Sequence, residues 1–151
     1  MNLNIGDKAP HFNLKDQNGI NISLSSLKGN RVILFFYPKD DTPGCTIEVC
    51  NFRDDFSQYT DIDAIILGVS PDGKESHRKF IKKFDLPFSL LCDEDHSVAE
   101  KYGAWGEKNM YGRKYMGIIR TTVQIDRDGT IEKIYEKVRT KNHSKDILET
   151  L

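Results

Sequence analysis

The sequence predicts an α/β fold, in which a central mixed β-sheet is flanked by helices. Two apolar runs without polar alternation, Arg31–Tyr37 (RVILFFY) and Ala64–Ser70 (AIILGVS), are typical of strands covered on both faces. A helical pattern lies between them, and a strand–turn–strand pattern follows at residues 121–135. Strands that alternate with helices and end in a hairpin predict a mixed sheet with helices on its faces.

The other elements follow from local signals in chain order. Residues 12–24 predict an N-terminal β-hairpin around Asn18–Gly19, because this pair supplies the positive backbone angles of a tight turn. Thr121–Ile125 and Ile131–Tyr135 flank Asp128–Gly129 and predict a second hairpin. Further helices are expected at Lys74–Phe84, at Asp95–Tyr102 and at residues 142–151, where Asn142 is the capping residue.

The composition makes several classes of partner improbable. The chain is 30% charged and 38% hydrophobic with a formal net charge of -1, so it has no strong electrostatic preference for nucleic acid or acidic membranes. No window approaches the ~18 apolar residues of a membrane span, and residues 1–19 lack the pattern of a secretory signal. We therefore expect one domain over residues 1–151, located in the cytoplasm, with catalytic, redox-active or buried cysteines.

A helix is predicted to begin just before Cys45. Apolar residues recur at three- and four-residue steps along one face, namely Val49, Phe52, Phe56 and Tyr59. Thr42 suits the N-cap and Pro43 the first helical position, so Cys45 falls in the first turn, at the end of a buried strand where ligand sites commonly lie. Unpaired N–H groups and aligned peptide dipoles stabilise a thiolate there, which predicts a nucleophilic sulfur.

Cys50, five positions after Cys45, cannot reach it within a regular helix. Five residues of helix rise by about 7.5 Å along the axis, beyond the ~7 Å Cα separation that a disulfide tolerates. A bridge between the two therefore requires the first turns of the helix to unwind. The sequence predicts two states, one helical with a pocketed Cys45 and one unwound with both sulfurs accessible.

Other interpretations of the cysteine pair remain open at this point. Cys50 can be a small core residue and Cys45 an incidental loop thiol. Thioredoxin-type chemistry uses C-x-x-C, whereas the spacing here is C-x4-C. Zinc accepts this spacing but needs more ligands, and His77 and His96 do not form a closely spaced pair. The Thr-Pro-Gly turn directly before Cys45 favours a reactive thiol.

The stretch YPKDDTPGCTIEVCNFRD, at residues 37–54, resembles the active-site segment of peroxiredoxins, which are thiol peroxidases of thioredoxin-like fold. The family pattern Pro-x-x-x-Thr-x-x-Cys falls on Pro38, Thr42 and Cys45. Four further segments look like the bacterioferritin comigratory protein, or peroxiredoxin Q, group: GDKAPHFNL, ILGVSPD, LLCDEDHSVAEKYGAWGEK and GIIRTTVQIDRDGTI. The resemblance covers nearly the whole chain and implies the thioredoxin-like version of the α/β fold.

The resemblance implies a two-step peroxidase cycle. Cys45 attacks hydrogen peroxide or an organic hydroperoxide and becomes a sulfenic acid, which Cys50 resolves as an intramolecular disulfide. Thioredoxin is the implied reductant, no metal or organic cofactor takes part, and related proteins are monomers or weak homodimers. Two alternatives use the same cysteines: a non-enzymatic redox sensor or holdase, and a general disulfide reductase, which the absent C-x-x-C argues against.

The resemblance also implies roles for residues around the thiol. Thr42 hydrogen-bonds the peroxide and the sulfur, Pro38 shields the pocket from water, and Arg120 supplies a fixed positive charge that Glu48 supports. The pattern at residues 117–126 alone favours a different reading for Arg120, an ordinary solvent-facing strand position in register with Thr122 and Gln124.

Three aromatic residues and the third cysteine are the remaining candidates for residues near the active site. Cys92 stands where related sequences more usually have serine, and we expect it to be buried in an interior strand rather than to compete for the sulfenic acid. Trp105, Tyr111 and Tyr115 are expected either in a loop near the pocket or in packing contacts.

Overall fold

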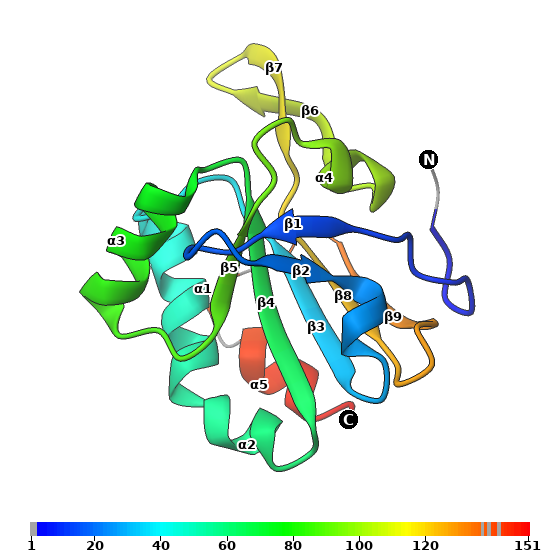
Figure 1. The fold of residues 1–151 in the computed structure, drawn as a ribbon. Coiled ribbons are helices and arrows are strands. Elements are labelled where there is room, and N and C mark those ends of the chain that lie inside the picture. Colours follow the sequence, from blue (N-terminus) through cyan, green and yellow to red (C-terminus); the bar gives the residue numbers. More distant parts are fainter. Residues whose placement is uncertain (1–2, 137, 139, 142) are drawn as a thin grey trace.

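A seven-stranded mixed sheet with the order β2-β1-β5-β4-β3-β8-β9 forms the centre of the computed structural model, which describes residues 3–136, 138, 140–141 and 143–151 (Figure 1). β3, β4 and β5 are parallel, whereas β1, β2, β8 and β9 pair antiparallel to their neighbours. The strands are β1 (Asn13–Lys15), β2 (Asn21–Ser23), β3 (Arg31–Phe36), β4 (Ala64–Ser70), β5 (Ser89–Cys92), β8 (Thr121–Ile125) and β9 (Ile131–Tyr135). The predicted mixed sheet and N-terminal hairpin are confirmed.

The sheet separates two hydrophobic cores, and β3 contributes to both. Its residues alternate between the faces: Val32, Leu34 and Phe36 belong to one core, and Ile33 and Phe35 to the other. All five side chains are at most 1% exposed. Burial on both faces explains why this run of sequence shows no polar alternation.

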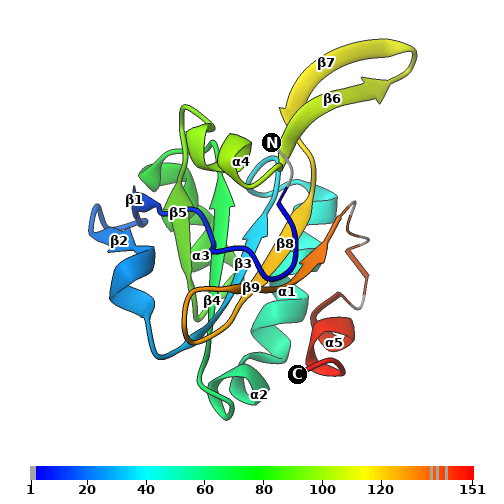
Figure 2. The same cartoon turned by 90° about the vertical axis from the view of Figure 1, so that its right-hand side faces the viewer.

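Helices cover both faces of the sheet (Figures 1 and 2). One face carries α1 (Pro43–Asp54), α2 (Phe56–Thr60), α3 (Lys74–Phe84) and α5 (His143–Leu148). The other face carries α4 (Ser97–Lys101) and the 3-10 helix η1 (Leu24–Leu27). Because α1 and α3 both follow parallel strands, the β3–α1 and β4–α3 loops meet at the same edge of the sheet.

The helix predicted from Cys45 to Tyr59 is divided into α1 and α2. Asp55 interrupts it with φ −99° and ψ 7°. The predicted apolar face is otherwise present, since Val49, Phe52 and Tyr59 are buried and Phe56 is half-buried.

Smaller differences concern α4 and α5. α4 begins at Ser97 and ends at Lys101, so it is shorter than predicted at both ends. α5 begins at His143, and its expected capping residue, Asn142, lies outside the described residues. No helix in the described part of the chain is both long and apolar enough to cross a lipid bilayer.

The predicted hairpin of β8 and β9 is present, but a further hairpin, β6 (Trp105–Met110) with β7 (Arg113–Ile118), was not predicted. It forms a separate two-stranded sheet that projects from the rest of the molecule (Figure 2). Tyr111 and Gly112 form its turn with positive φ angles of 54° and 77°, and Tyr111 is fully exposed. Trp105 stacks on the ring of His96 at a centroid distance of 3.7 Å. Charged and glycine residues in both strands obscure the alternation that normally indicates a hairpin.

Candidate active site

Cys45 lies in the first turn of α1, which follows the C-terminal end of β3 across the loop of residues 37–42. Thr42 occupies the N-cap position, and the backbone N–H of Thr46 donates the first helical hydrogen bond to the Thr42 carbonyl at 2.8 Å. The Cys45 side chain is 0% exposed and packs in the same core as Val49. This placement agrees with the helix start predicted from the Thr-Pro-Gly turn.

The side chain of Thr42 does not cap the helix, which corrects the prediction. Its Oγ1 donates instead to the Lys39 carbonyl at 2.9 Å, and no hydrogen bond joins it to the N–H groups of α1. This hydrogen bond joins the two ends of a short turn in the loop that also contains half-buried Pro38. The Thr42 hydroxyl oxygen keeps acceptor capacity for a proton donor such as a hydroperoxide.

Arg120 connects Cys45 with Glu48. Its Nη2 donates to Cys45 Sγ at 3.2 Å, and its Nη1 donates to Glu48 Oε1 at 2.7 Å. Burial alone would lower the pKa of Arg120, but the charges of Glu48 and Cys45 outweigh it and raise that pKa. A Cβ at Gly44 would come within 3.3 Å of Nη2, so the absent side chain at Gly44 leaves room for the guanidinium.

The alternative reading of Arg120 as an ordinary solvent-facing position is wrong. Thr122 and Gln124, which share its register, are 0% and 4% exposed, and the Arg120 side chain itself is 17% exposed. Thr122 Oγ1 lies 2.8 Å from Nε2 of His143 in α5. His143 is itself buried, and this burial lowers its pKa to about 4. The C-terminal helix therefore covers this face of β8, and alternation within β8 could not reveal a cover supplied by a distant segment.

Glu48 is fully buried beside Arg120. Burial raises the pKa of Glu48 from 4.5 to about 7, although the Arg120 charge and hydrogen bond oppose the rise. Its Oε2 has no hydrogen-bond partner among the described residues. The missing partner is consistent with burial outweighing the ion pair, because a desolvated carboxylate with one unsatisfied oxygen disfavours the charged form.

Glu48→Gln is expected to flatten the pH dependence of stability. The pKa is raised in the folded state, so the stabilisation that Glu48 gives is complete below about pH 4.5 and is lost as the pH rises through about 7. A shift of this size corresponds to about 3 kcal/mol in the free energy of unfolding between acid and pH 8. Glutamine keeps an oxygen for Arg120 and does not titrate. Urea denaturation from pH 4 to 8 measures the effect, with the exposed Glu149→Gln as control; equal slopes for Glu48→Gln and the wild type would contradict it.

Cys50 and Cys92 are free thiols like Cys45, and both are half-buried. Cys50 lies on the same helix as Cys45, and burial raises its pKa. Cys92 is the last residue of β5 and is less buried than expected, and its Sγ lies 3.9 Å from the Asp16 carbonyl. Burial is the main cause, and nearby carboxylates a smaller one, that raise the pKa of Cys92 to about 11. Cys92 is therefore a protonated thiol at neutral pH.

The structure also brings residues to the site that the sequence did not indicate. Burial and the Arg120 charge lower the pKa of Lys108 in β6, and Cys45 opposes this only in part. Lys108 therefore lies within electrostatic range of both Arg120 and Cys45. Asn51 of α1 donates to the Thr140 carbonyl at 2.7 Å, and this contact anchors the helix to the segment before α5. Both residues lie in segments that resemble the family, but their contacts reach other elements of the fold, so local patterns did not single them out.

Comparison with known proteins agrees with this geometry. Residues 5–134 match the AhpC/TSA family. The chain belongs to the AhpC/TSA family. Within it, Peroxiredoxin Bcp of Bacillus subtilis (strain 168) is 47% identical over 151 residues, which cover 100% of this chain and 96% of the relative. Peroxiredoxin Bcp of Escherichia coli (strain K12) is 43% identical over 149 residues, covering 99% and 96%.

Solved structures of AhpC/TSA-type peroxiredoxins share the fold. A cysteine-to-serine mutant of Xylella fastidiosa PrxQ superposes with a TM-score of 0.94 at 31% identity, covering 99% of this chain and 96% of that one. The Xanthomonas campestris bacterioferritin comigratory protein, studied for alkyl peroxide reduction, gives a TM-score of 0.88 at 32% identity over 92% and 88% of the chains. The chain is a peroxiredoxin with a thioredoxin-like fold and peroxidase activity, as the sequence predicted.

Proposed function

We propose that residues 1–151 form one peroxiredoxin domain in which Cys45 is the peroxide-reacting thiol, and that Cys50 resolves its oxidised form. The observation that carries the proposal is the contact of Arg120 Nη2 with the buried Cys45 Sγ at 3.2 Å. A guanidinium at this distance donates a hydrogen bond to the sulfur and stabilises negative charge that develops at the reacting atoms. The second contact of Arg120, with Glu48, holds the guanidinium in that orientation.

The first step oxidises Cys45. Its thiolate attacks one oxygen of the peroxide, the O–O bond breaks, and the second oxygen takes up the proton that the Cys45 thiol released and leaves as water or an alcohol. The product is Cys45 sulfenic acid. Arg120 opposes the negative charge that builds on the oxygens, and Thr42 Oγ1 can accept a hydrogen bond from the peroxide. We include organic hydroperoxides among the substrates, because a related protein reduces alkyl peroxides.

The second step requires α1 to unwind. The continuous helix from Pro43 to Asp54 holds Cys45 and Cys50 about 7.5 Å apart along its axis, which is too far for a disulfide. Unwinding also exposes Cys50 and so relieves the burial that raises its pKa. The Cys50 sulfur then attacks the sulfenic sulfur, a disulfide forms, and water leaves.

A dithiol protein closes the cycle. We propose thioredoxin, whose two thiols reduce the Cys45–Cys50 disulfide and are themselves oxidised to a disulfide. We place this reaction in the cytoplasm, a reducing compartment in which free cysteines persist. The protein acts as a monomer or weak homodimer, with no nucleic-acid or membrane partner and no cofactor.

Peptide mapping after one equivalent of hydrogen peroxide tests the assignment. The expected product is a single disulfide between the peptides of Cys45 and Cys50, with Cys92 recovered as a free thiol. A bridge from Cys45 to Cys92 would overturn the resolving role of Cys50. The redox-sensor alternative gains support only if Cys45 reacts with peroxide no faster than free cysteine.

A further inference from the structure

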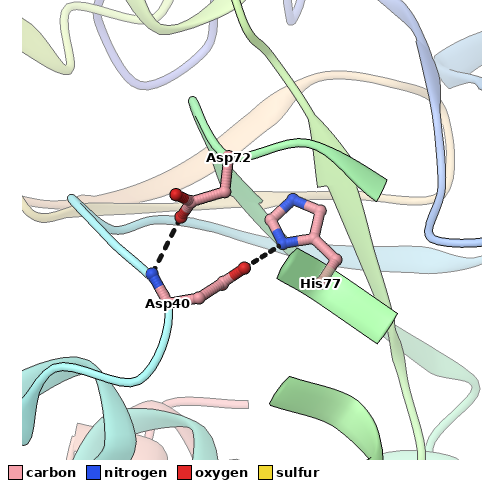
Figure 3. Close-up of side chains that lie close together, drawn as sticks. All are labelled: Asp40, Asp72 and His77. Carbon is pink, nitrogen blue, oxygen red and sulfur yellow. Dashed lines mark hydrogen bonds and ion pairs between the residues drawn. The ribbon is translucent and has the colours of Figure 1, made fainter. Parts of the chain in front are cut away.

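A buried polar cluster lies behind the active-site loop, which we define as residues 38–42. Figure 3 shows Asp40 of this loop between Asp72 and His77. His77 Nδ1 lies 2.7 Å from Asp40 Oδ2, and Asp72 Oδ2 accepts a 2.8 Å hydrogen bond from the Asp40 backbone N–H. The cluster therefore joins the β3–α1 loop to α3 and to the end of β4.

His77 is bonded at both ring nitrogens. Its Nε2 lies 2.9 Å from the Leu91 carbonyl, which can only accept, so Nε2 carries a proton. The Asp40 carboxylate already accepts hydrogen bonds from Tyr37 at 2.5 Å and from Ser76 at 2.7 Å. One further proton is shared between His77 Nδ1 and Asp40 Oδ2. With His77 0% exposed, no water competes for these bonds.

The cluster does not have the arrangement of a metal site. Asp40, Asp72 and His77 lie close enough to share an ion. Their facing atoms already satisfy one another, however, since Asp72 Oδ2 holds both the Asp40 N–H and the Ser70 hydroxyl. No unpaired ligand atom points inwards, so hydrogen bonding alone accounts for the geometry.

The next residue, Asp41, shows that the loop is held in an unfavourable shape. Its φ is 57°, in the left-handed region that L side chains rarely adopt. Asp41 Oδ2 also accepts from Lys83 of α3 at 2.8 Å. Both residues before Thr42 are thus fastened to α3, and a backbone of this kind persists only where its surroundings impose it.

We propose that the Asp40–His77 pair is a latch that positions the active-site loop for the reaction of Cys45 with peroxide. The proposal rests on the function proposed above. His77 and Asp40 are positioning residues: they do not touch Cys45, but they fix the turn from which Thr42 and the start of α1 follow. The latch matters while α1 is folded. It has no part in reduction of the disulfide, because that step takes place with α1 unwound.

Two isosteric replacements separate the two bonds of His77. Asparagine places its amide nitrogen near the former Nδ1, so His77→Asn keeps the bond to Asp40 and loses the bond to Leu91. Glutamine places its amide nitrogen near the former Nε2, so His77→Gln keeps the hydrogen bond to the Leu91 carbonyl and loses the one to Asp40. Both replacement side chains are uncharged and both are smaller than the imidazole ring. Each variant is therefore the control for the other, because they differ mainly in which hydrogen bond is lost.

Rapid mixing with hydrogen peroxide, alkylation of the remaining thiols and mass spectrometry give the rate constant for Cys45 oxidation. We expect His77→Asn to stay within about threefold of the wild type, and His77→Gln to lose about 10- to 100-fold. Reduction of the disulfide by thioredoxin should proceed at the same rate in all three proteins. Amide hydrogen exchange over residues 37–46 should accelerate in His77→Gln but not in His77→Asn.

Equal oxidation rates for His77→Gln and the wild type would overturn the latch while the peroxidase assignment stands. Equal losses in the two His77 variants would also overturn it, since packing or the Leu91 bond would then be responsible. A wild-type protein that reacts slowly would instead contradict the proposed role of Cys45. If the His77 variants do not fold, Asp40→Asn replaces them, with Ser76→Ala as a control that removes one hydrogen bond from the same carboxylate.

Discussion

Cys45→Ser is expected to lose peroxide turnover by about 10³-fold or more. The sulfur supplies the electron pair that breaks the O–O bond, and a serine hydroxyl remains protonated even beside the guanidinium of Arg120. The loss should appear as absent NADPH consumption in an assay with thioredoxin, thioredoxin reductase and hydrogen peroxide. Because serine fits the site of Cys45 closely, the fold and the hydrogen bond from Arg120 should survive.

Cys92→Ser is the matched control for this experiment. It removes a half-buried thiol at the end of β5, which burial and nearby carboxylates keep protonated. Turnover close to that of the wild type is expected. Normal turnover by Cys45→Ser, or a comparable loss in Cys92→Ser, would show that the peroxide reacts at another thiol.

Cys50→Ser is expected to separate the two halves of the cycle. Oxidation of Cys45 should keep its wild-type rate, because Cys50 lies more than a turn further along α1 and makes no contact with the guanidinium. Recycling by thioredoxin should stop, since no intramolecular disulfide can form. The sulfenic acid should then accumulate and, with excess peroxide, advance to the sulfinic acid.

Intact-mass spectrometry after one and after ten equivalents of peroxide measures this prediction. One added oxygen atom should mark the sulfenic acid and two the sulfinic acid, whereas the wild type should lose two hydrogens as the disulfide forms. Steady turnover of Cys50→Ser with thioredoxin would contradict the assignment. It would mean that the oxidised Cys45 is reduced directly or through Cys92.

The local order of the chain allowed much of the site to be predicted. The buried strand before Tyr37, the Thr-Pro-Gly turn and the helical pattern after it are short-range features, and they place Cys45 in the first turn of α1. Helix geometry alone shows that Cys50 cannot form a disulfide with Cys45 while α1 is folded. Resemblance to the family added Arg120, which its own strand pattern would have assigned to solvent.

Side-chain direction and the β6–β7 hairpin depended on the tertiary structure. Thr42 occupies the N-cap position, but its hydroxyl donates to the Lys39 carbonyl of the loop and does not accept from the N–H groups of α1. The hairpin was missed because its charged and glycine-containing strands lie in solvent and carry no core-facing alternation.

The sequence by itself determined the strands and helices of the main sheet, the position of Cys45 at a helix start and the family, because these depend on neighbouring residues and recognisable motifs. Only the tertiary structure decided which distant groups meet there: Arg120 with Cys45, α5 over β8, and His77 with Asp40. The physical reason is that burial and hydrogen bonding between segments tens of residues apart depend on the packing of the whole chain, which local patterns do not encode.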